Sequence, residues 1–139
     1  MNTSKNTPKK IDPKVLLSTL WVVVMFNILI ADILSLNIPG SAEGLAKTSA
    51  STGASIPQLM LVGAIMNELA IAMIILSRVL KYGVNRWVNI IIGIVTIAYI
   101  WIGGAASYPH YIFLATVETI SLLLIIWNAW KWRNPEAQS

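Results

Sequence analysis

The chain has 139 residues, of which 56% are hydrophobic and 12% charged, and its mean hydropathy is +0.69. Soluble domains carry about twice this share of charged residues, so the composition excludes a soluble fold and indicates an integral membrane protein. The absence of cysteine excludes disulfides, thiol catalysis and cysteine-based metal sites.

Four apolar stretches are each long enough to cross a bilayer as a helix. A hydrocarbon core about 30 Å thick needs about 20 residues at about 1.5 Å of rise per residue. The stretches that meet this length are residues 15–36, 57–80, 87–106 and 111–130. They are continuously apolar, whereas barrel strands alternate polar and apolar residues. We therefore predict an all-α membrane protein, with one four-helix domain over residues 1–139.

The segments between these stretches predict the topology. Residues 1–10 form a polar, lysine-rich tail, and the apolar run that follows is too long for a signal peptide, so the first span is expected to be retained. Residues 37–56 are small and polar, which favours flexible coil over one short helical turn around Ala42–Lys47, and this loop is long enough to cover a site on its face of the membrane. Ser55 and Gln58 then match a capping box at the start of the second span. The remaining connections are short, so an antiparallel up-down bundle is expected.

The basic residues predict the orientation. In a four-span topology nine of the ten basic residues fall on one side, and Lys47 alone falls on the other. Because Lys and Arg are enriched in cytoplasmic loops, both termini are predicted to be cytoplasmic, in a multi-pass protein of the inner membrane. The net charge of +4 is explained by this topology and by anionic lipid, so no nucleic-acid partner is expected.

Three carboxylates, Asp32, Glu68 and Glu118, lie deep in the apolar stretches without a Lys or Arg near them. A charged residue at the bilayer centre costs about 2.5 to 3.5 kcal/mol, so three of them indicate a function. Helical rise places Glu68 near the midplane, Glu118 a few ångströms outward and Asp32 about 10 Å outward. We predict a site in the outer half of the bundle, with the two glutamates at its core and Asp32 as its outer wall.

Other polar residues complete this predicted ligand site. Asn27, Asn67 and Tyr99 lie at about the level of Glu118, although Asn27 points about 140° away from Asp32 on the same helix. Helical spacing places two sets of residues on inward faces. These sets are Met60, Ala64, Asn67, Glu68 and Ile71 on the second span, and Tyr111, Ala115, Glu118 and Ser121 on the fourth. His110 and Tyr111 stand above this polar layer, at its mouth, and one histidine with carboxylates is not a metal motif.

Three functions are compatible with acids that have no resident cation. The first is binding or transport of a cationic or apolar small molecule, or of a proton, at the acidic pocket. The second is an intramembrane acid/base enzyme acting on a lipid-like substrate. The third is a structural or assembly subunit whose acids only hold helices together. The sequence favours the first and implies no cofactor. Four helices bury little surface between them, so a homo-oligomer in the lipid bilayer is also expected.

Several segments carry a resemblance to a known family. They are residues 16–27, residues 31–36 through Pro39 and Gly40, Asn67 and Glu68, residues 76–80, Asn85 and Arg86, and residues 126–132. Together they resemble a bacterial family of small four-span membrane proteins catalogued as a domain of unknown function. The resemblance implies a four-helix membrane fold and no activity.

Two further likenesses concern architecture alone. In size and span number the chain is similar to small multidrug exporters, which bind cations at a glutamate of the first helix, where this chain offers Asp32. Acid-rich sterol isomerases and DoxX-like proteins are the second likeness.

Overall fold

A computed structural model describes residues 11–102 and 108–133, and all regular structure in these residues is helical. The helices are α1 (Pro13–Leu36), α2 (Ser41–Thr52), α3 (Ile56–Val79), α4 (Tyr82–Ile102) and α5 (Pro109–Lys131). All but α2 are long and apolar enough to cross a membrane. The predicted all-α membrane fold with four spanning helices is therefore confirmed. The predicted tail over residues 1–10 and the predicted end of the third span, beyond Ile102, lie outside the described residues.

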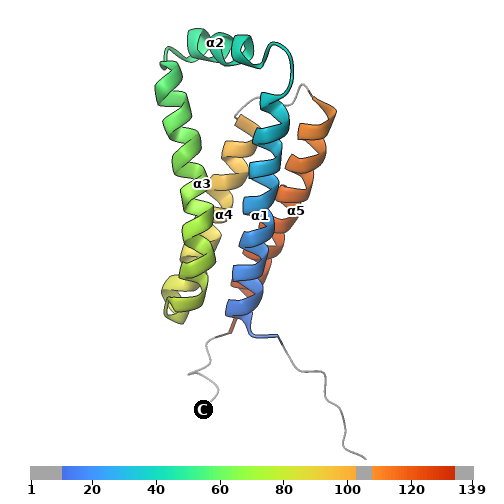
Figure 1. Cartoon of the computed structure of the whole chain (residues 1–139). Helices are drawn as coiled ribbons and strands as arrows, with labels where there is room; N and C mark the ends of the chain where they lie inside the picture. Colours follow the sequence, from blue (N-terminus) through green and yellow to red (C-terminus); the bar gives the residue numbers. More distant parts are fainter. Residues whose placement is uncertain (1–10, 103–107, 134–139) are drawn as a thin grey trace, which may run out of the picture.

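The four long helices alternate in direction (Figure 1). We call the end where α1 begins and α5 finishes the termini end, and the opposite end, crossed by α2, the α2 end. Helix α1 packs against both α3 and α5, and α5 also packs against α4, whereas α3 and α4 touch much less. The antiparallel up-down arrangement is as predicted, and the structure adds that α1 and α5 lie at the centre of the bundle.

Helix α1 and helix α3 begin at caps that the sequence encodes. The carboxylate of Asp12 accepts a hydrogen bond from the backbone N–H of Lys14 at 2.9 Å. At α3, Gln58 accepts from the backbone N–H of Ser55 at 2.8 Å, so the predicted capping box is confirmed. Each cap satisfies a backbone donor that the first helical turn cannot use, which fixes where each span starts.

The segment between the first two spans is helical, so the prediction of flexible coil is wrong. Helix α2 runs for 12 residues between Gly40 and Gly53, which have φ angles of 86° and 72°. These left-handed angles strain any residue with a side chain, and they turn the chain into and out of α2. Alanine, lysine and glutamate supply helix propensity within a composition that otherwise indicates a loop.

Helix α4 begins at Tyr82, five residues before the predicted start at position 87. The connection between α3 and α4 is shorter than predicted because Asn85, inside α4, donates hydrogen bonds to the end of α3. Its side-chain amide donates to the carbonyl of Ser77 at 2.7 Å and to that of Leu80 at 3.5 Å. These are carbonyls that the last turn of α3 leaves without a helical partner.

The tightest packing lies between the long helices on the termini side. The fully buried side chains there include Leu17, Trp21 and Val24 of α1, Met73 of α3, and Leu122 and Ile125 of α5. Gly93 lets α4 approach α5, because a Cβ at this position would lie 3.0 Å from Cγ1 of Ile126. Because the termini half is closely packed, space for a cavity remains in the α2 half of the bundle.

Candidate functional site

Buried polar side chains form a closed network in the termini half. The indole N–H of Trp21 donates to Oδ1 of Asn89 at 2.7 Å, and the hydroxyl of Ser77 donates to the same oxygen at 3.1 Å. The amide of Asn89 donates to Oδ1 of Asn85 at 2.6 Å and to its carbonyl at 2.8 Å. All four side chains are completely buried. The network joins α1, α3 and α4, and its satisfied groups indicate a structural role.

A cavity of about 210 Å³ lies in the α2 half, between α1, α4 and α5. Its polar lining residues are Asp32, Ser35, Tyr99, Tyr111 and Glu118, and its apolar ones are Ile28, Ala31, Ile100 and Ala115. No Lys or Arg of the described residues lines it. The cavity therefore presents acidic and phenolic groups against an apolar wall.

Glu118 is the most deeply placed ionisable group of the cavity. Its side chain is only 3% exposed, and its Oε1 finds no hydrogen-bond partner among the described residues. It belongs to the buried stripe of α5 that includes Ala115 and Ser121, as helical spacing predicts. The hydroxyl of Ser121 does not serve it, because that hydroxyl donates to the carbonyl of Val117 at 2.9 Å. A buried carboxyl oxygen without a partner needs a ligand, a water or a proton to satisfy it.

Asp32 lies on the α1 wall of the same cavity, toward the seam with α3. Its side chain is exposed, and Nδ2 of Asn67 is 3.5 Å from its Oδ2. Asn67 also donates to the carbonyl of Gly63 at 3.4 Å. The amide thus restrains the carboxylate from outside the cavity without neutralising its charge.

Two tyrosines from different helices complete the wall. The phenol of Tyr111 donates to the carbonyl of Ile100 at 3.4 Å, which ties α5 to α4. The phenol of Tyr99 reaches toward α3, where a Cβ on Gly63 would lie 3.4 Å from it. The sequence places Tyr99 in the site and Tyr111 above it, and both line the cavity. Ser35, which also lines it, was not among the predicted site residues.

Glu68 does not line the cavity, so the predicted pairing of Glu68 with Glu118 needs correction. Its side chain is exposed, and the predicted inward face of α3 is exposed at Met60, Ala64 and Ile71 as well. Helical rise gives the depth of a residue and says nothing of how its helix is rotated. The buried stripe of α3 is Met66, Ala70, Met73 and Ser77. At about 100° per residue, Glu68 lies about 160° from Met66 and Ala70, on the far side of the helix.

Asn27 also lies outside the cavity lining. Its amide donates to the carbonyl of Val23 at 2.8 Å, one turn earlier in α1. This local bond uses one N–H of the amide within α1 itself. The structure therefore brings Asp32, Tyr99 and Glu118 together, places Asn67 next to Asp32, and leaves Asn27 and Glu68 apart. Ligand binding by any of them stays a prediction.

Metal ligands do not converge in the described part of the chain. No group of three or more His, Asp or Glu residues there is arranged to hold a metal ion. His110 stacks on Tyr108 with ring centroids 5.9 Å apart. The two carboxylates of the cavity alone are too few ligands for a dedicated metal site.

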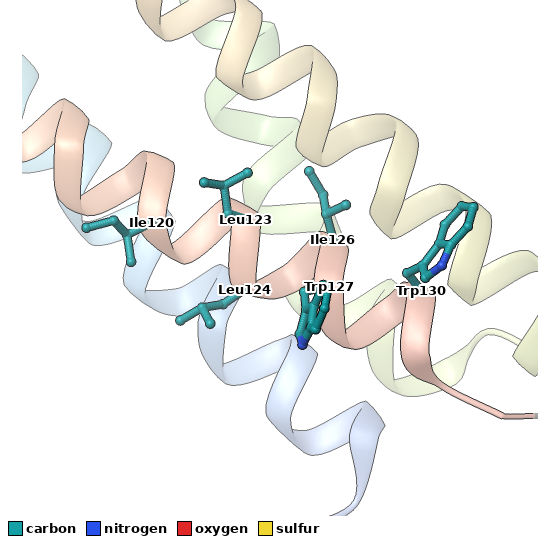
Figure 2. A pocket seen from close by; sticks show the side chains of 6 residues that line it. All are labelled: Ile120, Leu123, Leu124, Ile126, Trp127 and Trp130. Carbon is teal, nitrogen blue, oxygen red and sulfur yellow. The ribbon is translucent and has the colours of Figure 1, made fainter.

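A larger hollow of about 650 Å³ lies on the outer face of α5 and is almost wholly apolar (Figure 2). Its walls are Ile120, Leu123, Leu124, Ile126, Trp127 and Trp130. Lys131 lies beside it, with Nζ 4.2 Å from the centre of the Trp127 ring. A wide, apolar face of this kind suits lipid chains bordered by an aromatic belt. It contains no ionisable side chain, so the cavity between α1, α4 and α5 is the candidate site.

Residues 8–139 match the model of a family described as a family of unknown function, DUF6326. The chain belongs to the DUF6326 family. No curated protein and no solved structure shows a significant match to it. The resemblance to a domain of unknown function is thus confirmed. Membership supplies no activity, so the function of this DUF6326 protein has to be argued from its site.

The chemistry of the site favours a positively charged guest. Two carboxyl groups and two phenol rings face one space, and aromatic faces attract cations as carboxylates do. The volume of about 210 Å³ is below the roughly 300 Å³ at which pockets for drug-sized molecules begin. A small ammonium ion, or a few water molecules and a proton, would fit this DUF6326 cavity.

Proposed function

We propose that this DUF6326 protein is a membrane protein that binds a small organic cation, a primary or quaternary ammonium, between Asp32 and Glu118 and carries it across the bilayer. The observation that carries the proposal is the 3% exposed side chain of Glu118, whose Oε1 has no partner among the described residues. A cation placed there compensates the charge of the acid, and a primary ammonium also gives the free oxygen an N–H donor.

Each wall of the cavity has a part in this proposal. Glu118 is the deep anchor, and Asp32 is the second anchor nearer the α2 end, held in place by Asn67. Tyr99 and Tyr111 line the cavity, so their aromatic rings can contact the alkyl groups of an ammonium ion. When the cation leaves, a proton can replace it on a carboxylate, so entry of one and exit of the other are coupled.

The size of the cavity supports this function over an enzyme that acts on a lipid-like substrate. A sterol or a lipid chain exceeds a space of about 210 Å³, whereas a methylated amine does not. A purely structural role for the acids is also disfavoured, because Glu118 holds no other helix through Oε1. Binding of a small cation is compatible with both the small volume of the cavity and the unpaired oxygen of Glu118.

Binding of tetramethylammonium to the purified protein tests the proposal. Isothermal titration calorimetry should show one site, and Glu118→Gln should weaken binding about tenfold or more because the charge opposing the cation is lost. Asp32→Asn should weaken it less, since that carboxylate is more open. Glu68→Gln is the matched control, because it removes the same charge from α3 outside the cavity, and it should leave binding unchanged.

Three results would contradict the proposal. They are an absence of tetramethylammonium binding, equal losses in the Glu118→Gln and Glu68→Gln variants, and equally tight binding of tetraphenylphosphonium, which is too large for the cavity. Transport is tested separately in proteoliposomes that enclose a pH-sensitive dye. An outward gradient of tetramethylammonium, which has no proton to lose and so cannot cross the bilayer as a neutral amine, should drive a proton influx that Glu118→Gln abolishes.

We further propose that both termini face the cytoplasm, in the inner membrane. Lys14, Arg78 and Lys131 lie in the first or last turns of three helices at the termini end, and Lys47 lies in α2 at the other. The chain has no cysteine, so single cysteines can be introduced without background. A membrane-impermeant thiol reagent added to intact cells should label K47C and leave K131C unlabelled, and the reverse pattern would contradict the orientation.

A further inference from the structure

Glu68 occupies an unusual position for a carboxylate in a membrane helix. It is the thirteenth of the 24 residues of α3, so it lies within about one residue of the middle of the span. Its side chain is exposed on the outside of the bundle. Helix α3 is also the least enclosed span: 17% of the residues in its most apolar segment are buried, compared with 33% in each of the other three spans.

Lipid cannot satisfy this side chain. Acyl chains offer no hydrogen-bond donor or acceptor, and an acid at mid-depth costs about 2.5 to 3.5 kcal/mol on insertion scales. The face of α5 that carries Ile120 is different, because its lining is apolar and lipid chains cover it without loss. Of these two outward faces, the one around Glu68 therefore requires a protein partner.

We infer that the face of α3 around Glu68 is the contact surface for a second copy of this chain. A two-fold axis along the membrane normal brings equal depths together, so Glu68 of one copy meets Glu68 of the other. A carboxylic acid carries both an O–H donor and a carbonyl acceptor, so two such groups can each donate one hydrogen bond to the other and need no further partner. Ala64 and Ala72, one turn before and after, allow the two helices to approach closely. The inference is independent of the cation cavity, which Glu68 does not line.

Cysteine cross-linking in lipid tests this surface, and the absence of native cysteine makes each product interpretable. Under mild oxidation in proteoliposomes, A64C and A72C should each form covalent dimers. Two controls occupy exposed positions elsewhere: V62C lies about 160° from Ala64 on the same helix, and I120C lies at the middle of α5. Both controls should remain monomeric. Dimers through I120C alone, or no dimer at any position, would overturn the inference.

Substitution of Glu68 tests the chemistry of the contact. Glu68→Leu removes both hydrogen bonds and should weaken dimerisation about fivefold to tenfold, measured by energy transfer between labelled copies in liposomes. Glu68→Gln keeps a self-complementary amide and should preserve the dimer. Equal dimerisation of the leucine variant and the native chain would overturn the inference, as would capture of a different protein by A64C in cell membranes.

Misfolding is separable from loss of contact in this experiment. Leucine at an exposed membrane position should not lower the thermal midpoint in detergent, so a dimer lost at unchanged midpoint supports the contact. Tetramethylammonium binding should persist in both Glu68 variants. A failure of the cation proposal would therefore leave the dimer result standing, and the converse also holds.

Discussion

Near the termini end, four buried polar side chains from three helices satisfy one another, whereas near the α2 end the buried carboxyl of Glu118 keeps one oxygen without a partner among the described residues. Both regions lie inside the same bundle. In the first, the polar atoms of Trp21, Ser77, Asn85 and Asn89 meet at distances of 2.6 to 3.1 Å. In the second, a cavity of about 210 Å³ separates the polar groups.

The hydrogen-bond partners of a buried polar residue in a membrane helix indicate whether its role is structural. A saturated network stabilises one arrangement of helices, because each partner removed leaves another group unpaired. An unpaired acid beside a cavity lowers stability, and a ligand that pairs with the acid would offset that cost. A polar residue in a membrane helix is therefore not by itself evidence of a binding site, and its hydrogen-bond partners distinguish a structural residue from a candidate ligand.

Removing the centre of the network should have the largest effect on stability. Asn89→Leu deprives the indole of Trp21 of its acceptor and Asn85 of its donor, and we expect a loss of about 3 kcal/mol. Unfolding in mixed micelles of increasing SDS fraction measures the free energy. Asn27→Leu is the matched control, because it removes one local bond within α1 and should lose well under about 1 kcal/mol. Equal losses would remove the distinction between network and isolated polar residues.

Shortening the network by one donor should have an intermediate effect. Trp21→Phe keeps an aromatic ring in the core but loses the 2.7 Å bond to Asn89, whose oxygen still accepts from Ser77. We expect about 1 to 2 kcal/mol of destabilisation in the same assay. Trp127→Phe, on the exposed face of α5, should change little. A loss in Trp21→Phe as small as in this control would mean that the network contributes no stability.

Two glycines test how tightly each half is packed. In Gly93→Ala the new Cβ would lie 3.0 Å from Ile126, so that side chain must shift, and we expect about 1 kcal/mol of destabilisation. In Gly63→Ala the nearest atom is the phenol oxygen of Tyr99 at 3.4 Å, which is ordinary contact, so stability should be unchanged. Thermal midpoints of the two variants measure the contrast, and a reversed order would contradict the packing of the two halves.

The smallest effect on stability is expected at the candidate site itself. Glu118→Gln removes no hydrogen bond to Oε1 and places a neutral group in a buried position, so the thermal midpoint should stay constant or rise. The same variant should lose cation binding. A fall in the midpoint as large as that of Asn89→Leu would make Glu118 a structural residue.

The sequence predicts the membrane class and four spans because both follow from the length and apolarity of each stretch. It also identifies the buried face of α5, since Ala115, Glu118 and Ser121 recur at helical spacing. The sequence prediction fails at α2, where serine and threonine indicate a loop, and at the start of α4, because Asn85 lies one turn inside that helix. The carbonyls to which the Asn85 amide donates are at the end of α3 and cannot be predicted from its own segment.

For the candidate site, the sequence does not predict how each helix is rotated about its own axis. Depth along a helix follows from counting residues, and it correctly sets Glu118, Tyr99 and Asp32 in one half of the bundle. Which side of α3 faces inward depends on packing against α1, so the prediction that Glu68 faces inward is wrong. An Asn pair four residues apart, Asn85 and Asn89, was the available signal for the buried network.

Cation binding in the cavity is tested most directly by a crystal structure in lipid with bound tetramethylarsonium, an unreactive isostere of tetramethylammonium whose arsenic can be located by anomalous scattering. We expect one strong peak in the cavity between Asp32 and Glu118, beside the carboxyl group of Glu118. No such peak should appear in the Glu118→Gln variant under the same conditions. A closed cavity in which Oε1 of Glu118 bonds to a protein group, or a peak unaffected by the substitution, would contradict cation binding there.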